Sequence, residues 1–322
     1  MLKRVLLIVF CYIMSANSAQ SIDLSDIPLD VRPSSAQPLL MLILDNSSSM
    51  KAEYLTPETD GLFEHYSYLF VPENSASGQS TRGEDESVLP KSKRRLWKSQ
   101  WNGYNSIYYT PQVNYLPWAN GFGTTFKPAD VRCPCFDPVN CTQDSERIML
   151  SQPFMHVNVD GSDYTIANAH YFTVYDVNHN GVSELQEPVY LVTWADVDKD
   201  NILDCSGRAD DDRRLFFRYT DDGDGQIEDN ELALVENQDE KKRIMPVMTD
   251  DHGEFERVKT DCEDLQNFAN WFSYYRTRGL CLKFAVGSAL SSFKGDVQVG
   301  LYAVNNQPRT SVTARDGRPR RR

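Results

Sequence analysis

A segment in the second half of the chain carries oxygen ligands at the spacing that a calcium loop requires. It runs from Asp176 to Glu187 and fits the pattern D-x-[DN]-x-[DN]-G-x5-E at every required position. In such a loop the first, third, fifth and last side chains converge on one ion, and the residue after the glycine offers its carbonyl oxygen. The predicted ligands are Asp176, Asn178, Asn180, Val182 and Glu187.

Two further acidic runs follow. The segment from Thr220 to Glu231 has the glycine, the isoleucine and the final glutamate of a calcium loop, but a threonine stands at its first position. Its predicted ligands are Thr220, Asp222, Asp224, Gln226 and Glu231. Between the two loops, alternating carboxylates recur without the glycine or the final glutamate at Asp196, Asp198, Asp200 and Asp204. We interpret this third run either as a partial ion site or as a solvated acidic turn.

Three more oxygen ligands, Asp45, Ser47 and Ser49, follow the apolar run LLMLIL at 39–44. A continuous apolar run of this length is typical of a parallel strand that is buried on both faces. A carboxylate and two hydroxyls at alternate positions after such a strand can turn toward one magnesium or calcium ion. The pattern is similar to the metal-ion-dependent adhesion site of von Willebrand factor type A domains, in which the ion captures a carboxylate of a partner.

Periodicity predicts the elements that position these residues. The runs YFTVY and VYLVTW on either side of the first loop are β-like, and Pro188 follows its last ligand, so strands are expected there rather than the helix pair of an EF-hand. The segment from Asp261 to Phe293 reads as one long amphipathic helix, and 297–304 as a strand. The polar tract 51–90 reads as a loop. The aromatic residues of 97–118 are expected to pack in a satellite core, and a partner groove is the alternative.

The N-terminus has the features of a signal peptide. Lys3 and Arg4 precede an apolar stretch from Val5 to Met14, and small residues lead to a cleavage site near Ala19. The apolar stretch is shorter than the roughly 20 residues of a membrane-spanning helix. No later segment is long and apolar enough to span a bilayer, so export without a membrane anchor is expected.

Cysteine content and charge agree with export. An even number of cysteines remains after cleavage, which predicts disulfides of open connectivity. They are Cys133, Cys135, Cys141, Cys205, Cys262 and Cys281. A zinc site at the first three is the alternative, although it lacks paired C-x-x-C spacing. Cys262 and Cys281 should not pair, because one straight helix would hold them roughly 28 Å apart. The net charge of −13 disfavours nucleic acid and attracts hard cations.

Three segments in this order resemble the N-terminal region of the PilC/PilY family of type IV pilus tip adhesin and biogenesis proteins. They are LILDNSSSM, NSIYYTPQVNYLPW, and QNFANWFSYYRTR followed by VQVGLYAVN. The resemblance implies an α/β fold: an incomplete von Willebrand factor A (Rossmann-like) domain interrupted by a large, β- and loop-rich calcium-binding insertion. The implied organisation is a signal peptide (1–19), a leader (20–38), the A-like domain (39–50 and 261–305), an aromatic-rich insertion (51–160), an EF-hand-like calcium region (161–240) and a basic tail (306–322).

The resemblance also implies a function. The chain would be an exported calcium-binding component of the type IV pilus, in the periplasm, on the outer membrane surface or at the pilus tip of a Gram-negative bacterium. Its partners would be pilins or minor pilins and a host or surface ligand, and its ions Ca²⁺ and Mg²⁺. The chain stops before the downstream Thr and Asp ligands of the adhesion site, so that site is expected to be half built. The alternatives are a calcium-stabilised hydrolase, which would need a G-x-S-x-G motif around Ser47 or Ser49, and a non-functional fragment of a longer adhesin.

Overall fold

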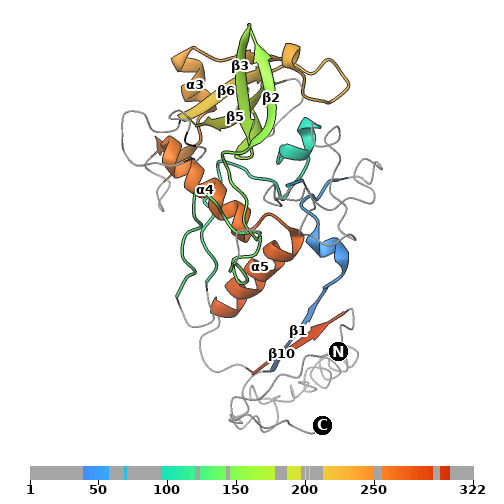
Figure 1. Cartoon of the computed structure of the whole chain (residues 1–322). Coiled ribbons are helices and arrows are strands. Elements are labelled where there is room, and N and C mark those ends of the chain that lie inside the picture. Colours follow the sequence, from blue (N-terminus) through green and yellow to red (C-terminus); the bar gives the residue numbers. More distant parts are fainter. Residues whose placement is uncertain are drawn as a thin grey trace, which may run out of the picture. The chain divides into compact units, whose positions relative to one another are not determined.

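The computed structural model describes residues 39–57, 69–70, 96–119, 124–142, 146–177, 187–196, 200, 203, 213–249, 256–292 and 298–304. The expected signal peptide, leader and basic tail, and most of the tract 51–90, lie outside these residues. The described part is a mixed α and β structure (Figure 1). None of its helices is long and apolar enough to cross a membrane. The chain divides into two compact units, 1–42 with 295–300 and 43–294 with 301–322.

The second unit contains a four-stranded antiparallel sheet. Its strands are β4 (His170–Val174), β5 (Val189–Ala195), β6 (Arg213–Tyr219) and β7 (Leu232–Leu234), in that spatial order. The β-like runs beside the first acidic loop therefore form strands, as predicted. Because consecutive strands pair, the β4–β5 and β6–β7 connections leave one end of the sheet, and the β5–β6 connection leaves the other. Both predicted calcium loops thus emerge from the same end.

Each face of this sheet packs on its own hydrophobic core. Tyr171, Val192 and Phe216 face a core that includes α4 (Asp261–Tyr274), whereas Phe172 and Leu191 face a second core. The second core includes residues of the hairpin formed by β2 (Pro153–Val159) and β3 (Ser162–Ala167). Neighbouring residues of a strand point to opposite faces, so two covered faces explain why β4 is buried along its whole length.

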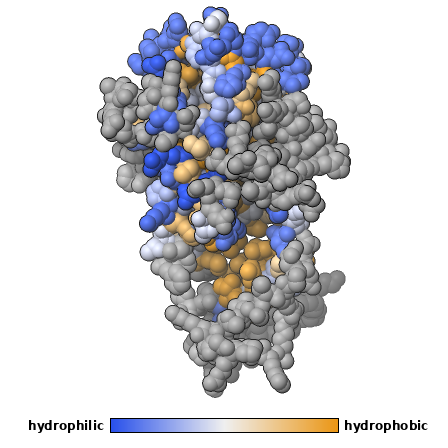
Figure 2. Space-filling model, viewed as in Figure 1, coloured by the Kyte–Doolittle hydropathy of each residue, from blue (hydrophilic) through white to orange (hydrophobic). Residues whose placement is uncertain are grey.

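Short elements complete the second unit. Asp160 and Gly161 make the turn between β2 and β3, with φ values of 53° and 80° that match a two-residue hairpin turn. The helix α3 (Gln238–Ile244) follows β7, and β8 (Val247–Thr249) pairs with β9 (Glu256–Val258). The described residues also include the 3₁₀ helices η1 (Ser48–Lys51), η2 (Trp97–Gln100) and η4 (Asp229–Glu231). Figure 2 shows hydrophilic side chains gathered over the end of this unit that carries β2, β3 and α3.

The predicted single helix from Asp261 to Phe293 is wrong, because the structure has two helices there. The first helix, α4, ends at Tyr274. The next residue, Tyr275, leaves the helical conformation with φ of −134°, and α5 (Arg278–Ser292) begins three residues after it. Thr277 starts α5, since its hydroxyl accepts a hydrogen bond from Leu280 N at 3.1 Å. The periodic apolar residues run across this break, so periodicity alone did not reveal it.

The strand β1 (Leu39–Leu44) is present as predicted, but the expected burial of both its faces is wrong. It pairs with β10 (Gln298–Ala303) in a sheet that has two strands among the described residues. Leu39 is 70% exposed and Ile43 is 66% exposed. An apolar run of this kind is typical of a strand inside a larger parallel sheet that is covered on both faces. Within the part of the chain that the structure describes, the pair of β1 and β10 has no such cover on both faces.

The aromatic segment packs internally, as predicted, but not in a satellite. Tyr108, Tyr109 and Trp118 belong to the same core as α4, and Trp97 and Trp101 belong to the second core. Figure 1 shows this segment running beside α4 and the sheet. The segment is therefore an integral part of both cores.

The cysteines bear out the disulfide prediction in part. Cys135 and Cys141 form a disulfide, which removes two of the three thiolates proposed for a zinc site. Cys262 is also disulfide-bonded, whereas Cys281 and Cys133 are free thiols. Cys262 and Cys281 are therefore not paired, but the reason given for this was wrong, because they lie on two helices.

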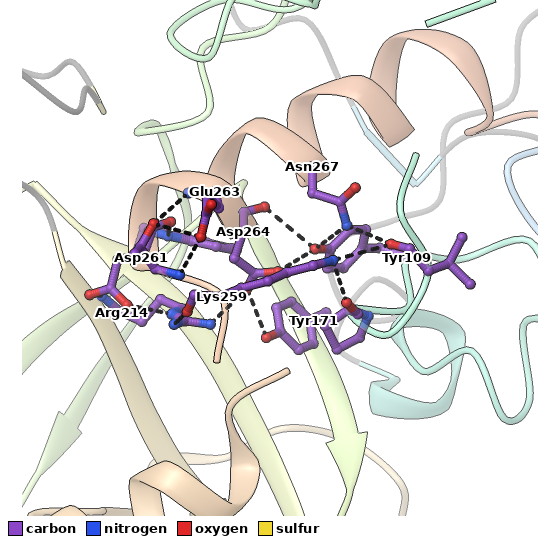
Figure 3. Close-up of polar contacts among 12 residues, drawn as sticks. Tyr109, Tyr171, Arg214, Lys259, Asp261, Glu263, Asp264 and Asn267 are labelled. Carbon is purple, nitrogen blue, oxygen red and sulfur yellow. Dashed lines mark hydrogen bonds and ion pairs between the residues drawn. The ribbon is translucent and has the colours of Figure 1, made fainter. Parts of the chain in front are cut away.

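A buried polar network joins α4, the sheet and the aromatic segment (Figure 3). Asp264, which is fully buried, accepts hydrogen bonds from Tyr109 Oη at 2.5 Å and Tyr171 Oη at 3.1 Å. Arg214 of β6 bridges Asp264 Oδ2 at 3.1 Å and Asp261 Oδ1 at 2.6 Å. Burial raises the pKa of Asp264, while Arg214 and the two hydroxyls act in the opposite direction. The network fixes α4 against the sheet because every buried charge has partners.

A second buried ion pair lies at the end of α4. Arg276 Nε contacts Glu53 Oε1 at 2.7 Å, and the two side chains are 2% and 0% exposed. Glu53 Oε2 accepts hydrogen bonds from the backbone N–H groups of Leu69 and Phe70. Arg276 also donates to the carbonyl of Phe272 and lies 4.2 Å from the centre of its ring. The pair ties the segment after Asp45 to the core.

Candidate metal centre

The connection between β6 and β7 brings four carboxylates together. One ligand oxygen from each of Asp221, Asp222, Asp224 and Glu231 lies within 4.8 Å of the others. The three aspartates are exposed and Glu231 is buried. Clustered carboxylate oxygens at the tip of a polar loop are the donor set that hard divalent cations prefer.

Hydrogen bonds within the loop hold these carboxylates in place. Asp221 Oδ1 accepts from Gly223 N at 2.9 Å and Gly225 N at 3.0 Å. Both glycines have positive φ, 111° and 75°, which a side chain would strain. Asp224 N donates to Asp222 Oδ1 at 3.2 Å. The loop therefore turns tightly around its own acidic side chains.

Glu231 is the most enclosed member of the cluster. Its Oε1 accepts from Asp222 N at 2.8 Å and its Oε2 from Glu228 N at 3.0 Å. Burial raises the pKa of Glu231, and the neighbouring charges of Asp222 and Asp221 raise it further. A nearby cation would relieve this repulsion because it favours the ionised form.

The aromatic segment contacts the cluster through Trp97. The indole Nε1 of Trp97 donates to Asp221 Oδ2 at 3.1 Å, and Trp97 N donates to Gly225 O. Burial would raise the pKa of Asp221, but donors that include Gly223 N and the Trp97 indole outweigh it and lower the pKa. An ionised Asp221 thus sits beside a buried tryptophan.

The structure brings together three of the residues that the sequence predicted as ligands in this loop. Asp222, Asp224 and Glu231 belong to the cluster, and so does Asp221, which was not among the predicted ligands. The backbone of Thr220 instead extends the β6–β7 ladder, donating to Glu231 O at 2.9 Å. The backbone carbonyl of the predicted ligand Gln226 accepts a hydrogen bond from Tyr219 Oη at 2.8 Å. The predicted ligand positions were those of an EF-hand loop, which lies between two helices. This loop follows the strand β6, and that difference was a signal that the first ligand could lie at another position.

The first loop is described only at its ends. Asn178, Asn180 and Val182 lie outside the described residues, whereas Asp176 and Glu187 lie within them. Val177 N donates to Glu187 Oε1 at 2.8 Å. This contact matches the one from Asp222 N to Glu231 Oε1, since each donor follows the first acidic residue of its loop. The final glutamates of the two loops are therefore anchored alike.

The third acidic run, between the two loops, is described only in part. Of the third acidic run, Asp196 and Asp200 are described, on the β5–β6 connection, and Asp198 and Asp204 lie outside the described residues.

The predicted adhesion residues do converge. Ser47 Oγ lies 3.0 Å from Asp45 Oδ2 and 2.7 Å from Ser49 Oγ, and Ser47 N donates to Asp45 Oδ1 at 2.8 Å. The structure thus brings a carboxylate and two hydroxyls to one point directly after β1, as the spacing predicted.

Comparisons of the chain with protein-family models, with curated proteins and with solved structures found no match.

Proposed function

We propose that the protein is an exported calcium-binding component of the type IV pilus that acts in pilus biogenesis or in adhesion at the pilus tip. The observation that carries the calcium part is the convergence of Asp221, Asp222, Asp224 and Glu231 on one point. The three segments that resemble the PilC/PilY family support the pilus part. The convergence of Asp45, Ser47 and Ser49 supports a von Willebrand factor A-like start and an adhesive role.

Calcium fits this donor set better than other common ions. The ligands are all oxygens, and zinc would favour nitrogen or sulfur. Magnesium demands near-ideal octahedral geometry and retains several waters, whereas calcium accepts several carboxylates in an irregular loop. Without a cation, four carboxylates within 4.8 Å repel one another. Calcium binding would therefore stabilise the β6–β7 connection and the Trp97 contact.

The position of Trp97 allows a direct test with terbium, which replaces calcium and is excited by a nearby indole. We expect sensitised terbium emission that calcium displaces. Glu231→Gln should weaken terbium and calcium binding at least about tenfold, because it removes a ligand charge. Asp239→Asn is the matched control, since its side chain is 84% exposed on α3 and lies outside the cluster. Trp97→Phe should reduce the emission while calorimetry still shows calcium binding.

Equal displacement of the Trp97-sensitised terbium emission by calcium in the wild-type protein and the Glu231→Gln variant would refute the site. The pilus role needs a separate experiment. Deletion of the gene in its native host should reduce the number of surface pili or the adhesion of cells, and the wild-type gene should restore them. Unchanged piliation and adhesion after deletion would exclude the pilus role, even if calcium binding were demonstrated.

A further inference from the structure

A cleft of about 580 Å³ lies between the aromatic segment, the edge of the sheet and the end of α3. Its walls are formed by 101–102, 109–112, 172–176, 243–245 and Val247. All of these residues belong to the second unit. The volume lies within the range of pockets that bind small ligands or short peptides. Neither the carboxylate cluster nor the Asp45 loop forms part of it.

The floor of the cleft is the edge of a strand rather than a face. Five consecutive residues, 172–176, line it, whereas a strand face would present only every second residue. Among the described strands, β4 is at the edge of the order β4-β5-β6-β7. Tyr175 N donates to Pro188 O on the β5 side. By alternation, the even-numbered residues of β4 direct their backbone groups away from β5 and toward the cleft side.

The outward-facing backbone positions of β4 that precede the cleft, His170 and Phe172, each contact the aromatic segment. The carbonyl of His170 accepts a hydrogen bond from Tyr108 Oη at 2.9 Å. Phe172 forms a parallel bridge with Trp101. The next outward position is Val174, and no described residue hydrogen-bonds to its outward N–H or C=O. The ladder that Trp101 begins therefore stops at the cleft, where the strand edge can accept another extended chain.

The rest of the lining suits such a chain. Trp101, Tyr175 and Met245 supply apolar surface, and Arg243, exposed at the end of α3, supplies a guanidinium. An added strand gains affinity from main-chain hydrogen bonds and specificity from pockets for its alternate side chains. Arginine pairs strongly with a carboxylate.

We propose that this cleft binds an extended peptide segment of a partner protein, which adds to the edge of β4 at Val174 and places a carboxylate on Arg243. The partner is thus recognised by a short, apolar, β-forming stretch with one acidic residue. The proposal does not depend on the cluster of Asp221, Asp222, Asp224 and Glu231, because none of these residues lines the cleft, although Asp176 of the first predicted calcium loop does.

The test starts from a displayed library of random heptapeptides selected on the immobilised wild-type protein. Enriched peptides are synthesised with a fluorescent label and measured by anisotropy. N-methylation of the peptide backbone should weaken binding at least about tenfold at residues of one parity and little at the other, because an added strand directs alternate N–H groups to its neighbour. Binding in a pocket without strand pairing would not produce this alternation.

Variants of the protein complete the test. Val174→Pro should also weaken binding at least about tenfold, since it removes an outward N–H while leaving the bonds to β5 intact. Its fold is checked by circular dichroism, and the N-methyl series remains decisive if that variant does not fold. Arg243→Gln should weaken the acidic peptides, whereas Lys242→Gln, an exposed neighbour on α3, should not. Failure to enrich any peptide, loss of the parity effect, or binding of oligosaccharides only would overturn the proposal.

Discussion

The buried pair of Glu53 and Arg276 allows a quantitative prediction of stability. Its two side chains are 0% and 2% exposed, so removing one partner leaves the other charge buried without its counterion. Breaking a buried pair in this way typically costs about 3–5 kcal/mol. In Arg276→Met, Glu53 keeps its two backbone donors, Leu69 N and Phe70 N. We therefore expect a loss near the lower end, about 3 kcal/mol in the free energy of unfolding.

Glu53→Ala should cost more than Arg276→Met. It unpairs the guanidinium and also leaves two backbone N–H groups without an acceptor, each worth about 1–3 kcal/mol when buried. Glu53→Gln retains an acceptor oxygen, so it should fall between the two. The order of these losses follows from the hydrogen bonds and not from charge alone.

Urea unfolding at pH 7 in millimolar calcium measures these changes. The double variant Glu53→Gln, Arg276→Met should lose less than the sum of the two single variants, by about 2 kcal/mol or more, because both single variants break the same pair. Arg218→Met is the matched control, since its ion pair with Glu240 is solvent-exposed and should contribute less than about 1 kcal/mol. Additive losses, or a loss in Arg276→Met no larger than in the control, would refute the reasoning.

Four further predictions concern pH and ions. Burial lowers the pKa of His170 from 6.5 to about 4, so the unfolded chain binds a proton below pH 6.5 that the folded chain excludes until about pH 4. The free energy of unfolding should therefore fall by about 3 kcal/mol as the pH drops through this window, and an equal fall in His170→Gln would contradict this assignment. Calcium should raise the melting temperature and chelation should lower it; identical melting curves would exclude a stabilising ion. Asp176→Ala with Glu187→Ala should remove the tightest calcium binding in calorimetry, and titrations that match wild type would show that the first loop is not the main site. Adhesion of this chain to pilin or host matrix should show little magnesium dependence, because Asp45 and its two serines offer only three ligands; magnesium-dependent adhesion that Asp45→Ala abolishes would show that another residue completes the shell.

The local patterns of the sequence were sufficient for the strands beside the first acidic loop and for the convergence of acidic residues in the second loop. Alternating and β-branched runs predicted β4 and β5, because residues of this kind pack on both faces of a covered sheet. The spacing of Asp222, Asp224 and Glu231 predicted their convergence, since alternate positions of a tight loop point to the same side. The same local logic brought Asp45, Ser47 and Ser49 together. These features depend on residues within about a dozen positions of one another.

Features that depend on distant contacts were decided by the tertiary structure. Asp221 enters the cluster because the β6–β7 ladder continues through Thr220 and because Trp97, more than a hundred residues earlier, donates to its carboxylate. The helix after Asp261 breaks at Tyr275, next to the arginine that pairs with Glu53. Neither contact produces a repeating pattern in the sequence. Each joins segments that are far apart along the chain, and that separation does not reveal whether they are close in space. The prediction that β1 is buried on both faces was wrong for the same reason. An apolar run shows that a strand could be buried, but the elements that pack around the strand determine whether it is.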